Sequence, residues 1–122
     1  MRSIGKIFSF SAAHHLPHHE GQCHGVHGHN WKLDVQITGP IQHNGPATGM
    51  IMDYKDLDAI VTKSIIEVHD HADLNNLHKN PTSEEMIETF ARHIQRFLPV
   101  GVEVLIIRLW ETEKCYAEWT AD

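Results

Sequence analysis

Residues 31 to 38 alternate strictly between apolar and polar side chains, and this pattern constrains the fold more than any other feature. The apolar members are Trp31, Leu33, Val35 and Ile37, and the polar members between them are Lys32, Asp34, Gln36 and Thr38. Successive side chains of a β-strand point to opposite faces, so the segment predicts a strand with one buried face. Such half-buried strands are typical of antiparallel sheets.

Three further segments are expected to be strands, at residues 4–10, 102–110 and 114–120. Between them, apolar residues at helical spacing predict two helices. Asp53 is a preferred N-cap residue for the first helix. Its expected buried stripe is Leu57, Ile60, Val61, Ser64, Ile65 and Val68.

The second helix has a capping-box pattern, with Thr82 at the N-cap and Glu85 three residues later. Its expected apolar face comprises Met86, Ile87, Phe90, Ala91, Ile94 and Phe97. Pro99 and Gly101 are expected to end it.

The order strand, strand, helix, helix, strand, strand predicts one α+β domain over residues 1–122. Its expected architecture is a four-stranded, mostly antiparallel sheet with two helices on one face. A small open sheet has unpaired edges, which favour association with further copies of the chain.

Charge and composition narrow the partners and the compartment. The formal net charge is −6, and no basic stripe marks a nucleic-acid surface. No apolar run approaches the ~20 residues that span a bilayer, and the N-terminus lacks a signal-peptide pattern, so we expect a cytoplasmic protein. Two cysteines, Cys23 and Cys115, do not make a disulfide framework.

Twelve histidines among 122 residues are the most unusual compositional feature. His27 and His29 lie two residues apart beside the alternating strand, so strand geometry directs both side chains to one face. His14 follows the first strand and joins them if these two strands pair. Three imidazoles with an open fourth position are typical of catalytic zinc.

Other interpretations of these residues remain open. Cys23 as a fourth ligand would make the zinc site closed and structural, and the histidine pair is alternatively a solvated loop feature. The role of His24 is ambiguous because it adjoins the cluster. We expect the histidines without such context to lie on the surface: His15, His18, His19, His43, His78 and His93.

A second polar cluster follows the first predicted helix. Asp70 can orient His71 and stabilise its protonated form, and Cys23 can supply a thiolate for proton transfer. Alternatively, Asp70 merely caps neighbouring backbone in a polar loop. Glu111 follows a strand, where a carboxylate is either solvated or accepts two N–H groups from a guanidine-like ligand edge.

Five motifs occur in an order and spacing that resemble the 6-pyruvoyl-tetrahydropterin synthase family. They are Phe10-Ser11-Ala12-Ala13-His14, Cys23-x-x-x-His27-Gly28-His29, Asp70-His71 with Leu74-Asn75, Asn80-Pro81-Thr82-Ser83-Glu84, and Glu111-Thr112. The short spacing from Cys23 to His27 resembles the bacterial 6-carboxy-5,6,7,8-tetrahydropterin synthase branch, which serves the synthesis of queuosine and other 7-deazaguanines.

This resemblance implies a role for each matching residue. His14, His27 and His29 match zinc ligands, and Cys23 matches the catalytic cysteine. Asp70 and His71 match the partners in its proton relay, and Glu111 matches the glutamate that anchors the pterin. The family's tunnelling fold implies trimers or hexamers with active sites between subunits.

The implied reaction converts 7,8-dihydroneopterin triphosphate to 6-carboxytetrahydropterin, with release of acetaldehyde and triphosphate. Two alternatives are a 6-pyruvoyl-forming reaction, which leaves the side chain uncleaved, and a non-catalytic zinc- or pterin-binding module. The sequence departs from the family pattern at His69, where an apolar residue is expected. His69 is either a further acid-base group or a packing residue at the helix end. No residues are assigned to the triphosphate.

Overall fold

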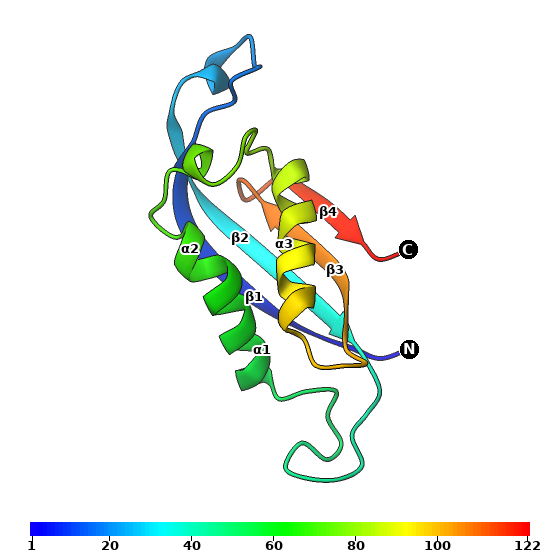
Figure 1. Cartoon of the computed structure of the whole chain (residues 1–122). Helices are drawn as coiled ribbons and strands as arrows, with labels where there is room; N and C mark the ends of the chain where they lie inside the picture. Colours follow the sequence, from blue (N-terminus) through cyan, green and yellow to red (C-terminus); the bar gives the residue numbers. More distant parts are fainter.

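Four antiparallel strands form one sheet in the order β1-β2-β3-β4, and the helices cover a single face of it (Figure 1). The computed structural model describes all 122 residues. The elements in chain order are β1 (Ser3–His14), β2 (His27–Thr38), α1 (Tyr54–Val61), α2 (Glu67–His69), α3 (Ser83–Phe97), β3 (Glu103–Trp110) and β4 (Tyr116–Thr120). The predicted α+β architecture is confirmed.

The alternating segment lies in β2, at the centre of the hydrophobic core. Its four apolar side chains, Trp31, Leu33, Val35 and Ile37, are at most 1% exposed. They belong to one apolar cluster with residues of α3 such as Phe90 and Ile94. The period-two pattern therefore predicted correctly which face of the sheet the helices cover.

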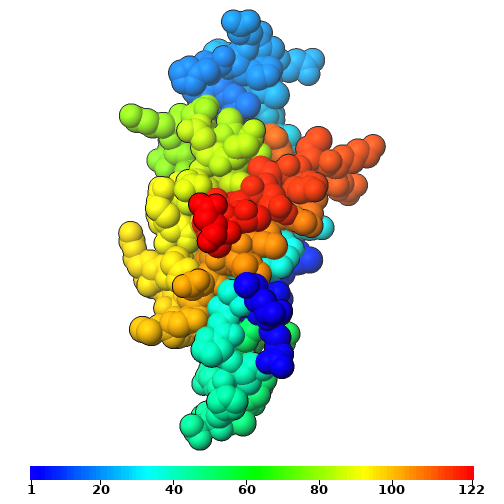
Figure 2. Space-filling view, turned by 90° about the vertical axis from the view of Figure 1, so that its right-hand side faces the viewer, coloured from blue at the N-terminus to red at the C-terminus, as the bar shows by residue number.

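β1 and β2 are longer than the sequence pattern predicts. β1 continues to His14, β2 begins at His27, and these two residues are direct cross-strand partners. Residues 15–26 connect the strands and project from one end of the molecule, while residues 39–53 form the other end (Figures 1 and 2). The extension brings the histidine-rich segment into regular strand geometry.

The first helical segment contains a π-helical turn, Thr62–Ile66, between α1 and α2. Asp53 caps α1 as predicted, since its carboxylate accepts the Lys55 N–H at 2.8 Å. A π turn holds more residues than an α turn, so buried positions recur every four residues: Leu57, Val61, Ile65 and His69. The prediction that Val68 is buried is wrong: its side chain is 47% exposed, and His69 takes the buried place.

α3 begins at the predicted cap, where the Thr82 hydroxyl accepts the Glu85 N–H at 3.2 Å. The reciprocal half of the capping box is absent, because the Glu85 carboxylate accepts from the Asn80 amide instead. Phe97 was expected on the buried face but is 57% exposed. It occupies the last position of the helix and lines a surface pocket with Ile60 and Ser64 of the first helical segment. No helix of the chain is long and apolar enough to cross a membrane.

Candidate metal centre and active site

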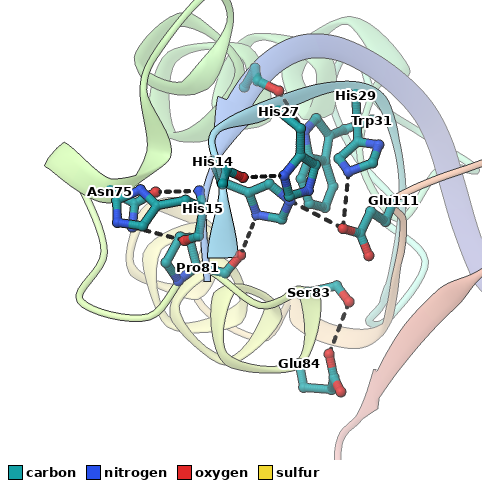
Figure 3. A network of polar contacts seen from close by, with 12 residues as sticks. His14, His15, His27, His29, Trp31, Asn75, Pro81, Ser83, Glu84 and Glu111 are labelled. Carbon is teal, nitrogen blue, oxygen red and sulfur yellow. Dashed lines mark hydrogen bonds and ion pairs between the residues drawn. The ribbon is translucent and has the colours of Figure 1, made fainter. Parts of the chain in front are cut away.

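Three histidines converge at one end of the sheet, on the face that the helices cover. His14 ends β1, while His27 and His29 begin β2 and share a face with Trp31 (Figure 3). One potential ligand atom from each histidine, together with one from Glu111, falls within 4.8 Å of the others. The pairing of β1 with β2 thus unites the three histidines that the sequence singled out.

Backbone carbonyls orient two of the rings. The Nδ1 atom of His14 lies 2.8 Å from the Pro81 carbonyl oxygen, and that of His27 lies 2.8 Å from the Gly25 carbonyl oxygen. A carbonyl only accepts, so each Nδ1 carries the proton and each Nε2 presents a lone pair. This arrangement is typical of histidines that bind metal ions through Nε2.

Glu111 follows β3 and completes the cluster. One of its carboxylate oxygens lies 3.1 Å from Nε2 of both His14 and His29 (Figure 3). Those two Nε2 atoms are buried and have no hydrogen-bond partner. Burial lowers the pKa of His29, which outweighs the opposing effect of Glu111 and favours the neutral imidazole that binds metals. Three imidazole nitrogens and one carboxylate oxygen are a donor set that fits zinc.

The fourth group beside the three histidines is therefore Glu111, and Cys23 is not part of the cluster. Cys23 lies in a 3-10 turn, Gln22–His24, within the projecting loop. Its carbonyl accepts the Leu16 N–H at 2.7 Å, while its thiol is free. The Cys23 sulfur therefore lies outside the cluster of residues that can hold a metal.

A cavity of about 480 Å³ adjoins the cluster between the start of α3 and the β3-β4 hairpin. Glu111 lines the cavity and also belongs to the cluster that can hold a metal. Ser83, Glu84 and Trp119 line other parts of the cavity. A molecule in the cavity can therefore contact the Glu111 carboxylate and lie beside the histidines.

Asp70 and His71 form a second group at the edge of β1. The Asp70 carboxylate accepts the Ser11 backbone N–H at 2.9 Å, and its other oxygen lies 3.1 Å from His71 Nδ1. The Ser11 amide is the largest cause that lowers the pKa of Asp70, so the carboxylate stays ionised. His71 has a left-handed backbone (φ 61°) and a side chain that is 84% exposed.

Within one chain, no hydrogen bond joins Cys23 to Asp70 or His71. His71 lines a second cavity of about 420 Å³ together with Gly28, His29 and Asn30. The fold therefore brings together the predicted metal ligands and Glu111, and it brings together Asp70 and His71, but it leaves Cys23 apart from both groups.

Comparison with known proteins assigns the chain to a family. Residues 3–122 match the pattern of 6-pyruvoyl tetrahydropterin synthase. The chain belongs to this family.

A 6-carboxy-5,6,7,8-tetrahydropterin synthase of Haemophilus influenzae is 33% identical in an alignment 139 residues long that includes 98% of this chain and 99% of the relative. A 6-pyruvoyl tetrahydrobiopterin synthase of Homo sapiens is 31% identical over 90% of this chain and 85% of its own length. The 6-pyruvoyl tetrahydropterin synthase of Caenorhabditis elegans has the same fold, with a TM-score of 0.82 at 23% identity over 99% of this chain and 96% of that one. The tunnelling fold of the family is thereby confirmed.

Several supporting residues of this family member were not predicted from its sequence. His15, expected on the surface, is half-buried, and its backbone N–H and C=O both bond to the Asn75 amide at 2.9 Å. His78, also expected on the surface, is half-buried against His69. Neither contact has a signal in local spacing, because each joins residues from separate segments.

Proposed function

We propose that this chain is a zinc-dependent lyase that converts 7,8-dihydroneopterin triphosphate to 6-carboxy-5,6,7,8-tetrahydropterin, releasing acetaldehyde and triphosphate. The place we propose for it is 7-deazaguanine synthesis, including that of queuosine, in the cytoplasm. The observation that carries the proposal is the cluster of His14, His27, His29 and Glu111 beside a cavity. The name of the 33% identical relative that spans nearly the whole chain supports the carboxy-forming reaction over others.

His14, His27 and His29 would hold the zinc through their Nε2 atoms. The ion, when bound, would act as a Lewis acid that makes the hydroxyl protons of the substrate side chain easier to remove. The carbonyls of Pro81 and Gly25 support this role, since each holds a ring in the tautomer that a metal ligand needs.

Glu111 would anchor the pterin ring in the 480 Å³ cavity, where its carboxylate can accept two N–H groups from the ring edge. Its position 3.1 Å from Nε2 of His14 and His29 places the carboxylate at the border between cavity and cluster. A ring bound there would present its side chain to the metal, and such orientation supplies a large part of many catalytic effects.

Cys23 and His71 would transfer protons between the substrate side chain and the ring. Asp70 would hold His71 through its Nδ1 atom and stabilise the imidazolium, and their 3.1 Å contact supports this role. Because Cys23 contacts neither residue within its own chain, we propose that the acid-base set is completed between subunits of a trimer or hexamer. Sheet edges at β1 and β4 offer the surfaces for such assembly.

The decisive experiment is product analysis by mass spectrometry after incubation of zinc-replete protein with 7,8-dihydroneopterin triphosphate. The proposal predicts 6-carboxytetrahydropterin together with acetaldehyde. A 6-pyruvoyl product with an intact side chain would assign the other reaction of the family. Absence of any product from assembled, metal-loaded protein would overturn the enzymatic assignment and favour a binding module.

A further inference from the structure

A buried pair of histidines lies outside both groups of site residues. His69 is 3% exposed, and its Nε2 atom lies 2.9 Å from Nε2 of His78. The Nδ1 atom of His69 lies 2.7 Å from the Ile65 carbonyl oxygen, to which it must donate. His69 Nε2 therefore accepts, and His78 Nε2 donates, so both tautomers are determined by the contacts.

The surroundings of the pair favour neutral rings. Phe90 packs edge-on against His69 at 4.8 Å between ring centroids, and Phe10 lies at 5.9 Å. Burial is the main cause that lowers the pKa of both histidines. The neighbouring His69 and then His93 lower the pKa of His78 further, to about 4, and His93 also lowers that of His69. At neutral pH the bond between two uncharged imidazoles is thus stable in an apolar setting.

The segment that this bond closes supports both groups of site residues. His69 directly precedes Asp70, whose carboxylate accepts the Ser11 N–H, and the His71 N–H donates to the Ser11 carbonyl. Three residues beyond His78, the Pro81 carbonyl holds Nδ1 of His14. The pair therefore joins the two ends of the loop that presents the acid-base residues.

We propose that His69 and His78 are positioning residues, which fix residues 70–77 so that Asp70 and His71 keep their geometry against β1. This inference rests on the proposed function for its kinetic consequence. An apolar residue at position 69 would fill the same space but would leave the loop without its hydrogen bond to His78. Neither His69 nor His78 lines the cavity that contains Glu111, so we do not assign a catalytic role to either residue.

The first test examines the pair in the wild-type protein by ¹⁵N NMR of the histidine rings at pH 7. The expected spectrum has neutral His69 protonated at Nδ1 and neutral His78 protonated at Nε2, with slow exchange of the latter proton. An imidazolium signal, or the opposite tautomers, would overturn the inference. This measurement does not depend on turnover.

The second test compares His78→Leu, which removes the bond, with His78→Gln, whose amide retains a donor. His43→Gln is the control, since His43 is an exposed histidine in the loop at the other end of the molecule. We expect kcat to fall about tenfold in His78→Leu with KM within about twofold, and to recover in His78→Gln, because misplacement of catalytic groups lowers the rate more than it lowers binding. Equal rates in the two variants, or an unchanged kcat in both, would contradict a positioning role. Should His78→Leu fail to fold, His78→Asn, too short for the bond, replaces it.

Hydrogen exchange separates this inference from the proposed function. The His71 amide should exchange about tenfold faster in the bond-free variant than in the wild type and the control, since the loop loses one of its tethers. If the wild type lacks turnover, the proposed function fails, but unchanged exchange at His71 alone would overturn the inference.

Discussion

The metal group (His14, His27, His29 and Glu111) and the acid-base group (Cys23, Asp70 and His71) are assembled from different kinds of structure. His14 and His27 are cross-strand partners in β1 and β2, His29 lies two residues further along β2, and Glu111 reaches them from the end of β3. Cys23 and His71, in contrast, lie on separate loops, and although His15 and Asn75 join these loops, no hydrogen bond joins Cys23 to His71. Strand register places the three histidines of the first group, whereas the second group depends on the conformation of its loops and, in our proposal, on contacts between subunits.

The largest expected effect concerns the metal group. His27→Ala removes one of three imidazoles, so zinc content measured by atomic emission should drop from about one ion per chain to nearly none. His43→Ala, in an exposed loop, is the matched control and should retain the metal. Retention of zinc by His27→Ala would show that the ligand set is wrong.

Mixing variants tests whether the acid-base group forms between subunits. Cys23→Ala and His71→Ala should each lower kcat by roughly 10²-fold or more, since each removes a proton-transfer group. When the two are unfolded and reassembled together at equal amounts, about a quarter of intersubunit sites in a symmetric oligomer regain both residues. Activity that stays at the level of the single variants would show that each site takes both residues from one subunit, and would contradict a site formed between subunits.

Glu111 lies where the metal group meets the cavity, and its substitution distinguishes a pterin anchor from a metal ligand. Glu111→Gln should raise the Kd for the pterin about tenfold or more, because it removes a charge-assisted hydrogen bond, and zinc content should be retained. Glu113→Gln, an exposed carboxylate two residues away, is the control. Loss of zinc with unchanged pterin affinity in isothermal titration would instead make Glu111 a metal ligand.

The smallest expected effect is a change in stability with pH at the loop that presents Asp70. Burial lowers the pKa of His78 from 6.5 to about 4, so the unfolded chain binds the proton more readily. The contribution of His78 to the free energy of unfolding is complete above pH 6.5 and is lost as the pH falls toward 4. For a half-buried ring, this loss lowers the free energy of unfolding by about 1–2 kcal/mol.

Urea unfolding at pH 7 and pH 4.5 would measure this effect. In His78→Gln, the free energy of unfolding should change less between the two pH values than in the wild type. His43→Gln, which changes an exposed histidine, should behave as the wild type does. An identical pH dependence in His78→Gln would show that His78 is not the titrating group.

Much of the fold was predictable because its signals are local. Strict alternation identified β2 and its buried face, and the caps Asp53 and Thr82 marked where the helices begin. The π turn was not predictable, since its one extra residue moves the buried position from Val68 to His69. Helical periodicity assumes a constant number of residues per turn, and a single irregular turn breaks that assumption.

The sequence by itself determined the three histidines as a set, because strand geometry at a spacing of two directs His27 and His29 to one face and a hairpin brings in His14. Only the tertiary structure decided what surrounds them, namely the Pro81 carbonyl that accepts from His14 and the Glu111 carboxylate beside His14 and His29. It also decided the separate pairing of His69 with His78 behind Asp70. These contacts join segments separated by many residues, and a packed fold rather than local spacing sets the distances between such segments.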